Sequence, residues 1–166
     1  LKKEENIILQ VGKTFGHLYQ SVFFKEVYSI TEGPPPEINL SNEKNNGITV
    51  LNLINNKLIS SAHDISSGGL ILALAEMCMS SGLGLKIEKP SKLSNLMEYY
   101  FGEDQGRYLL EIEPKNYQKV VKNLNENNIF NEKIATVQKD KLEIIGELKL
   151  NIDDLYKINN TWYNNY

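Results

Sequence analysis

The spacing of hydrophobic residues along the chain predicts an alternation of strands and helices. Short apolar runs that are rich in β-branched residues and end at glycine or polar residues indicate strands. We expect strands at 6–11, 58–62, 83–87, 107–112, 133–138 and 141–145. Only Lys139-Asp140 separates the last two ranges, which predicts a hairpin between them.

Apolar residues three or four positions apart predict helices. We expect helices at 20–28, 41–56, 70–79, 91–99, 116–125 and from 152 onward. In the second helix, Ser41 is the expected N-cap, and Ile48, Leu51 and Ile54 follow helical spacing. The segment 32–36 contains three prolines, which exclude both helix and sheet pairing, so we expect an ordered loop there rather than a domain linker.

The order of these elements predicts the α/β or α+β class, with helices on both sides of a mixed sheet. A chain of 166 residues suits one domain spanning 1–166, in which 1–11 is either the first strand or the end of a preceding domain. Hydrophobic residues make up 41% and charged residues 23%, which favours a packed core over disorder. Because the chain begins at Leu1 rather than methionine, we expect a piece of a longer polypeptide.

Charge and cysteine content narrow the range of partners. A net charge of -3 argues against nucleic acid or an anionic membrane surface as the main partner. No apolar run reaches the roughly 20 residues that span a bilayer, and the first residues lack the apolar region of a signal peptide. The single cysteine, Cys78, excludes a disulfide framework and fits a reducing cytoplasm. We expect it to act as a small buried hydrophobic residue rather than a nucleophile.

The densest pattern of reactive side chains is the segment SAHDISSGGL, residues 61–70. A helix N-terminus attracts anions, and Gly68-Gly69 lets a phosphate approach the backbone. Ser66 and Ser67 add hydroxyl donors, and Asp64 is a hard oxygen ligand suited to the Mg²⁺ that accompanies nucleotides. A structural role is equally compatible with the spacing: Asp64 or Ser66 caps the helix and His63 is a hydrogen-bonded core residue. Two ligands, His63 and Asp64, are too few for zinc.

Two further segments carry weaker signals. In FGEDQGRY, Glu103, Gln105 and Arg107 can present an acceptor, an amide and a cation to one ligand, although a solvated turn with an ion pair fits the chemistry better. The GKTFG segment at 12–16 lacks the GxxxxGK[ST] order of a phosphate loop, so we expect an ordinary strand-to-helix turn. No catalytic residue is assigned.

Taken together, the segments resemble one enzyme family. SAHDISSGGLILALAEM resembles the AHDxSDGGL(x)xALAEM signature of phosphoribosylformylglycinamidine (FGAM) synthase, and FGEDQGRYLLEI resembles its FGExQGRY strand. The stretch GHLYQS…EGPPPEINLSNEKNNG resembles the family's GxLGxS…EGxPPxVDLxxExxNG. The similarity covers most of 6–113 and looks like the second, C-terminal copy of a duplicated fold.

The resemblance implies an ATP-dependent C–N ligase of purine biosynthesis, which amidates formylglycinamide ribonucleotide with glutamine-derived ammonia. It implies an α/β/α unit similar to the C-terminal domain of aminoimidazole ribonucleotide (AIR) synthetase, with partly ferredoxin-like topology. The implied partners are the remaining domains of the same polypeptide and a glutaminase domain or subunit. The chain alone is expected to be inactive.

By the same resemblance, Asp64 matches a Mg²⁺ ligand and Ser66 a phosphate contact of an auxiliary ATP/ADP site, whose turn includes Ser67, Gly68 and Gly69. Glu103 and Gln105 match positions that touch substrate in the first repeat. Two departures argue against full occupancy of this site: Ser67 replaces the usual aspartate, and Tyr19 replaces a glycine. Two alternatives remain, a structural and interaction domain with a vestigial nucleotide site, and the C-terminal domain of another AIR synthetase superfamily member.

Overall fold

A seven-stranded mixed sheet forms the centre of the protein. The computed structural model describes residues 1–88, 90 and 95–164, with the last three residues as backbone only. The strand order is β2-β4-β1-β5-β3-β6-β7, and every neighbouring pair is antiparallel except β3–β6. The strands are β1 (Ile7–Val11), β2 (Ser61–Ile65), β3 (Gly84–Ile87), β4 (Arg107–Ile112), β5 (Asn131–Gln138), β6 (Lys141–Ile144) and β7 (Leu148–Asn151).

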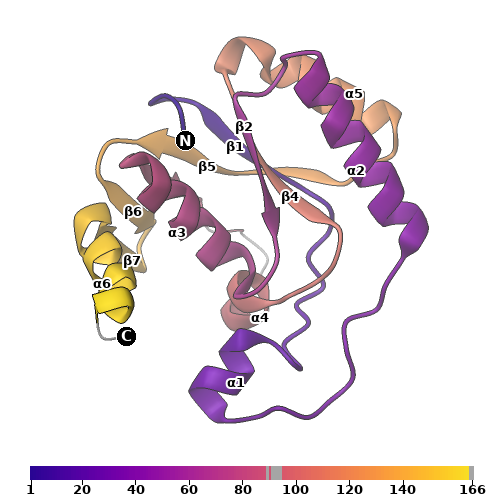
Figure 1. Ribbon diagram of the computed structural model, residues 1–166. Helices are drawn as coiled ribbons and strands as arrows, with labels where there is room; N and C mark the ends of the chain where they lie inside the picture. Colours follow the sequence, from indigo (N-terminus) through magenta and orange to yellow (C-terminus); the bar gives the residue numbers. More distant parts are fainter. Residues whose placement is uncertain (89, 91–94, 165–166) are drawn as a thin grey trace.

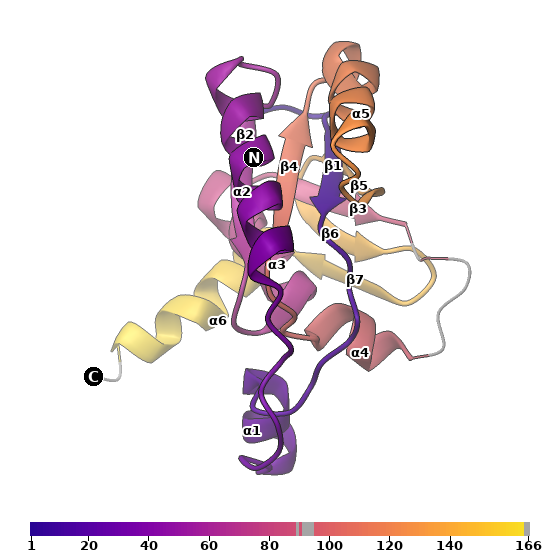
Figure 2. The ribbon, with the colours of Figure 1, turned by 90° about the vertical axis from the view of Figure 1, so that its right-hand side faces the viewer.

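Helices cover both faces of the sheet, as the sequence predicts (Figure 1). The helices are α1 (Val22–Tyr28), α2 (Leu40–Asn55), α3 (Gly69–Ser81), α4 (Leu96–Phe101), α5 (Tyr117–Glu126) and α6 (Ile152–Asn164), with a short 3-10 turn, η1 (Pro114–Asn116), before α5. α3, α4 and the start of α6 contribute to the core on one face, and α2 and α5 to the core on the other. α1 lies outside both layers, below the sheet in Figures 1 and 2.

The two cores meet across the central strands. Successive residues of a strand point to opposite faces, so in β1 Ile8 joins the α3 side and Leu9 the α2 side. Both are fully buried, as are Leu109 and Leu110 in β4. Residues 7–11 are therefore an interior strand of this sheet. Among the described residues, no helix is long and apolar enough to cross a membrane.

The predicted hairpin between 133–138 and 141–145 is wrong, because β3 lies between β5 and β6. The short link between them crosses the start of β3, where Gly84 N–H donates to the Lys139 carbonyl at 2.6 Å. A side chain on Gly84 would collide with the Lys141 carbonyl, so only glycine fits beneath the link. The hairpin that does form joins β6 to β7, a strand that the sequence did not predict.

The N-cap expected for the helix at 41–56 is also wrong, and the residues that gave its helical spacing are not the ones that it buries. The cap is Asn39, whose Oδ1 accepts from the Asn42 amide at 3.0 Å. Val50 and Leu53 face the sheet, whereas the three residues of the expected face are about half exposed. The helix has apolar residues on two sides, and only packing against the sheet decides which side is buried. The exposed residues are Ile48, Leu51 and Ile54.

Two other boundaries shift. The strand expected at 58–62 is β2, which starts three residues later because Leu58 and Ile59 instead pack under the α2 core. The helix expected at 91–99 is α4, which starts at Leu96 with Asn95 as its cap. The part of that expectation at 91–94 lies outside the described residues.

Candidate functional site

A hollow of about 320 Å³ at the end of β2 gathers five of the residues predicted to bind ligand. β2 and β4 are antiparallel neighbours with Asp64 opposite Tyr108, so the turn after β2 lies beside the turn before β4. Residue Glu43 of α2 forms the opposite wall. The lining residues are Glu43, Asp64, Ile65, Ser66, Ser67, Glu103, Asp104, Gln105, Gly106, Arg107 and Tyr108.

Asp64, Ser66 and Ser67 present exposed polar groups to this hollow. The Asp64 carboxylate is 70% exposed. Both serines are exposed, and within the part of the chain that the structure describes their hydroxyls have no hydrogen-bond partner. Neither Asp64 nor Ser66 caps α3 with its side chain, because the N-cap is Gly68 and has no side-chain cap. These side chains are therefore available to a ligand.

Gly68 and Gly69 do not line the hollow; they are buried where α3 meets α4. Both have positive φ angles, 80° and 70°. A Cβ on Gly69 would lie 2.8 Å from the Gly102 carbonyl oxygen and 2.7 Å from the Phe101 carbonyl carbon. The glycine pair thus permits a tight turn and close packing of α3 against the end of α4. It supports the residues that line the hollow without lining it itself.

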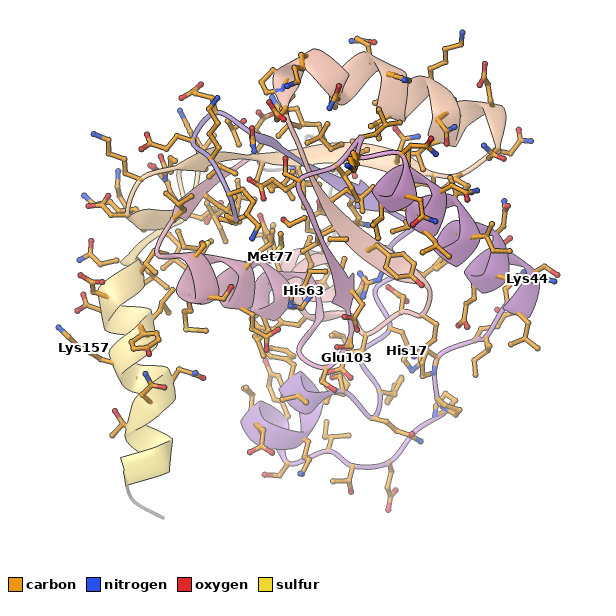
Figure 3. The ribbon with its side chains drawn as sticks, turned by 45° about the horizontal axis from the view of Figure 1, so that its top comes forward. His17, Lys44, His63, Met77, Glu103 and Lys157 are labelled. Atoms are coloured by element: carbon orange, nitrogen blue, oxygen red, sulfur yellow. The ribbon has the colours of Figure 1, made fainter. Side chains whose placement is uncertain are left out.

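Glu103 occupies the anion position at the start of α3 (Figure 3). Its Oε1 accepts from the Gly68 amide at 2.8 Å and from the Val22 amide at 2.7 Å. A carboxylate here complements the partial positive charge of the helix N-terminus. Glu103 therefore joins the first turns of α1 and α3, and one of its oxygens is already committed inside the protein.

His63 lies against the Asp64 carboxylate, with its Nδ1 4.0 Å from Asp64 Oδ1, and it contacts α3 through its Nε2. Its Nε2 lies 3.3 Å from a carboxylate oxygen of Glu76, and its Nδ1 lies 2.6 Å from the Asp64 carbonyl oxygen. The histidine is a hydrogen-bonded, partly buried residue.

Arg107 does not offer a free cation to a ligand, because its side chain is fully buried. It donates to the carbonyls of Asp104 and Gly102 and to Thr14 Oγ1. Burial lowers the pKa of Arg107, while the neighbouring Asp104 carboxylate acts in the opposite direction. The expected ion pair exists in a loose form, with Nη1 3.9 Å from Asp104 Oδ2.

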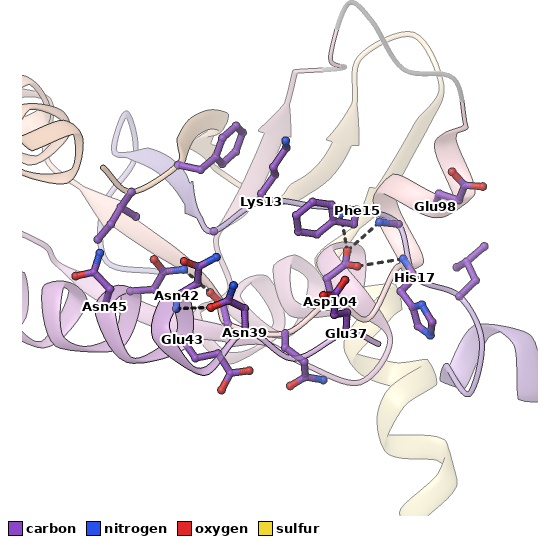
Figure 4. Close-up of a pocket in the computed structure, with 18 of the residues that line it drawn as sticks. Lys13, Phe15, His17, Glu37, Asn39, Asn42, Glu43, Asn45, Glu98 and Asp104 are labelled. Carbon is purple, nitrogen blue, oxygen red and sulfur yellow. Dashed lines mark hydrogen bonds between the residues drawn. The ribbon is translucent and has the colours of Figure 1, made fainter. Parts of the chain in front are cut away.

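Asp104 organises the loop after β1, a role that sequence reasoning missed (Figure 4). Its carboxylate accepts from the amides of Phe15 and Gly16 at 2.9 Å and of His17 at 3.2 Å. The GKTFG segment is the strand-to-helix connection that we expected. Its backbone amides do bind an anionic group, but that group is the Asp104 carboxylate and not a ligand phosphate. The sequence feature that could have indicated this role is the acidic residue directly before Gln105-Gly106.

A second and larger cleft, of about 900 Å³, lies beside the hollow and shares Glu43 and residues 104–106 with it. Its walls are the loop 12–19, the start of α2 and residues 128–130 (Figure 4). Asn46, buried on α2, donates to the Gly106 carbonyl at 2.9 Å and fixes the turn between the two depressions. Asn46 belongs to the NEKNNG motif, but its role was not predictable from that motif alone.

Comparison with known proteins decides the family. The model of the AIR synthase related protein, C-terminal domain, matches residues 3–147. The chain belongs to this family.

The curated relatives confirm the resemblance to FGAM synthase. The chain is 48% identical over 166 residues to phosphoribosylformylglycinamidine synthase subunit PurL of Pelagibacter ubique, covering 100% of this chain and 23% of the relative. It is 39% identical to the PurL subunit of Bartonella bacilliformis, covering 97% and 22%. The chain thus spans less than a quarter of the curated relatives that it matches.

Solved structures share the fold of this AIR synthase related domain. Thermotoga maritima PurL complexed with FGAR superposes with a TM-score of 0.77 at 16% identity, covering 93% of this chain and 28% of that one. Escherichia coli HypE, a hydrogenase maturation protein, superposes with a TM-score of 0.61 at 14% identity, covering 90% and 49%. The expected fold class is confirmed.

The two departures from the family pattern lie in different depressions. Ser67 lines the hollow, so the missing aspartate removes a carboxylate from that site. Tyr19 lines only the larger cleft, where its ring fits against Gly33 and meets Phe24 edge-on at 5.6 Å. The bulk of Tyr19 therefore does not enter the hollow that contains Asp64.

The described part of the AIR synthase related domain contains no preformed cluster of metal ligands. Within the described residues, no group of three or more histidine, cysteine, aspartate or glutamate side chains is placed to hold a metal ion.

Cys78 is buried in α3, and this burial raises the pKa of its thiol to about 12, as expected for an unreactive residue.

Proposed function

We propose that this chain is the C-terminal AIR synthase related domain of the second repeat of FGAM synthase. That enzyme uses ATP and glutamine-derived ammonia to amidate formylglycinamide ribonucleotide. The observation that carries the proposal is the 48% identity to a PurL subunit over the whole chain. The domain is inactive alone, since three quarters of the relative lie outside the match.

Within the enzyme, the domain contributes an auxiliary Mg–nucleotide half-site formed by Asp64, Ser66 and Ser67. The exposed carboxylate and the two unpartnered hydroxyls in one hollow support this role. Three other carboxylates, Glu43, Glu103 and Asp104, line the same hollow and would repel a bare phosphate. A bound Mg²⁺ would offset this repulsion, because it binds readily through one or two carboxylates together with nucleotide phosphates. Glu103 and Gln105 border the site as further ligand contacts.

A second candidate is a structural and interaction domain with a vestigial nucleotide site. One observation favours it: the Gly68 amide, a natural phosphate donor at the start of α3, is already bound to Glu103. Ser67, which stands where the family usually has an aspartate, also favours a vestigial site. The two candidates differ in one property, which is whether Mg–nucleotide is held at Asp64.

The partners that follow from the proposal are the remaining domains of the same polypeptide and a glutaminase domain or subunit. A solved relative bears the description PurLQS from Thermotoga maritima. The single cysteine of the sequence, the buried Cys78, suits a reducing cytoplasm.

An amidation assay tests the proposal. Formylglycinamide ribonucleotide, Mg·ATP and ammonium chloride are supplied, so that no glutaminase is needed. We expect the full-length polypeptide that carries this chain to form FGAM and the 166-residue chain alone to form none. Turnover by the isolated chain contradicts the non-autonomous role, and an inactive full-length polypeptide contradicts the enzyme assignment.

A further inference from the structure

One carboxylate of the protein occupies a backbone donor that a nucleotide phosphate would use. Gly68 does not line the hollow, but its amide donates at 2.8 Å to Glu103 Oε1, which belongs to a residue that does. The hydroxyls of Ser66 and Ser67 directly precede this amide in the same turn. A phosphate that reaches both hydroxyls is close enough to reach the amide as well, since successive polar groups of one turn can share an anion.

The side chain of Glu103 can move while its backbone stays fixed. Its amide donates to the His17 carbonyl at 2.8 Å, and the next residue, Asp104, is buried and binds three amides. Glu103 itself is only partly buried. Among the described residues, no cationic side chain forms an ion pair with it. Rotation of the side chain therefore breaks its two hydrogen bonds to amides and no ion pair.

The second of these hydrogen bonds ties α1 to the site. The Val22 amide donates to the same Oε1 atom at 2.7 Å. α1 has seven residues, none of them buried, and a helix this short needs tertiary support. Phe23 stacks on Phe101 with ring centroids 4.3 Å apart, whereas the other ring contacts of α1 are within the helix or with Tyr19. Loss of the Glu103 contact therefore loosens the start of α1.

Charge favours the exchange of Glu103 for phosphate over the addition of phosphate beside it. The carboxylates of Glu43, Asp64 and Asp104 also line the hollow, and like charges repel strongly where water is partly excluded. A phosphate bound beside an unmoved Glu103 would face all four carboxylates without the Gly68 donor. A phosphate that displaces Glu103 gains this donor and moves one negative charge away from itself.

We propose that Glu103 competes internally with the nucleotide phosphate, so that Mg–nucleotide binding at Asp64 displaces it and releases the start of α1. The inference rests on the proposed Mg–nucleotide half-site and adds a means of regulation to it. Nucleotide binding and the position of α1 are then coupled in both directions. Any contact that holds α1 in place weakens nucleotide binding, and bound nucleotide loosens α1. The rotated side chain of Glu103 still borders the hollow.

Calorimetric titration of the full-length polypeptide with Mg·ADP tests the competition. Glu103→Gln keeps an oxygen that can accept from both amides but removes the charge, so the variant should fold and bind Mg·ADP about tenfold more tightly at the Asp64-dependent site. Glu43→Gln is the matched control. It also removes one carboxylate from the hollow, but this carboxylate accepts no hydrogen bond in the described structure. It should change the affinity by less than about threefold.

Hydrogen exchange of the full-length polypeptide measures the coupling independently of affinity. In the native protein, the amides of 22–24 should exchange about threefold faster, or more, with saturating Mg·ADP than without it. In Glu103→Ala, which has no acceptor, they should exchange equally fast under both conditions. The amides of 120–124 in α5 belong to the core on the other face of the sheet and should not respond to nucleotide in either protein.

Two results overturn the proposal. One is a Glu103→Gln variant that binds Mg·ADP no more tightly than the native protein, which would make Glu103 a ligand contact rather than a competitor. The other is unchanged exchange at 22–24 when nucleotide binds. Identical titrations of the native protein and Asp64→Ala would instead refute the half-site itself, so the two failures are distinguishable.

Discussion

The Oε1 atom of Glu103 lies 2.8 Å from the backbone nitrogen of Gly68. The amide of Gly68, the N-cap residue of α3, therefore already has an anionic partner, and the same oxygen also accepts from the first amide of α1. A nucleotide phosphate at this turn has to use the hydroxyls of Ser66 and Ser67 and a metal on Asp64, or it has to displace Glu103. The role of Glu103 is thus first of all to hold two helix starts together.

Removing Glu103 should destabilise the domain. Glu103→Ala leaves the amides of Gly68 and Val22 without their acceptor, which costs about 1–2 kcal/mol by analogy with helix caps. Urea unfolding of the isolated chain measures this free energy. Glu37→Ala, an exposed carboxylate, is the control and should change stability by less than about 0.5 kcal/mol. Equal changes in the free energy of unfolding of the two variants would contradict the role of Glu103 in holding the starts of α1 and α3 together.

Asp104→Asn should loosen the loop after β1. The substitution removes the charge that three consecutive amides and the buried Arg107 share, and it should cost about 3 kcal/mol. We expect faster hydrogen exchange at the amides of Phe15, Gly16 and His17. The exposed Asp140→Asn should be close to neutral in both measurements. Unchanged exchange at all three amides would show that the carboxylate does not organise the loop.

Glu111 should make stability depend on pH. Burial alone would raise the pKa of this carboxyl, but hydrogen bonds from Ser61, Asn6 and the amides of Lys2 and Lys3 outweigh it and hold the pKa below its ordinary value of 4.5. The folded state then binds fewer protons than the unfolded state around this pH. The stability that Glu111 contributes is therefore complete above about pH 4.5 and is lost as pH falls through the folded pKa.

Unfolding free energies measured from pH 7 to pH 3 for the native chain and Glu111→Gln test this. The variant should be less stable at pH 7 by about 2 kcal/mol, since an amide cannot accept all four bonds. The difference should shrink below pH 4.5. Using the difference cancels the contribution of Glu132, whose pKa burial raises. A difference that stays constant with pH would contradict the assignment.

Gly84→Ala tests the unusual strand crossing. A methyl group at this position meets the backbone of Lys141, so the link between β5 and β6 must move, at a cost of about 3 kcal/mol. Gly146→Ala is the control, because no atom lies within 4 Å of the added carbon and only its φ of 78° opposes the substitution, by about 1 kcal/mol. Chemical denaturation should rank the two variants in this order, and the reverse order would argue against β3 lying beneath the link.

The sequence predicted those features that local pattern controls. Gly82 ends α3 where expected, and the apolar run of β4 marks a strand buried on both faces. The candidate site was also predictable, since Asp64, Ser66 and Ser67 are consecutive or nearly so and their chemistry is readable without the fold. Pairing of β2 with β4 then brings them to Glu103 and Gln105.

Features that depend on distant contacts were not predictable. Only two residues, Lys139 and Asp140, separate β5 from β6, which suggested a hairpin. In the structure β3 lies between these strands and pairs with both of them. Arg107 was expected either in a solvated turn with an ion pair or facing a ligand, because no local signal shows that it is buried. The partners of Asp104 are almost ninety residues away in sequence, so its role emerges only when β1 and β4 pair.

Calorimetric titration of the full-length polypeptide with Mg·ADP tests the central claim, that Asp64 holds a Mg–nucleotide half-site. We expect Asp64→Ala to bind one equivalent of nucleotide fewer than the native protein. Asp154→Ala, which removes an exposed carboxylate on α6, should retain the native stoichiometry. Identical stoichiometry and affinity in the native protein and Asp64→Ala would contradict the account and leave the domain with a structural role alone.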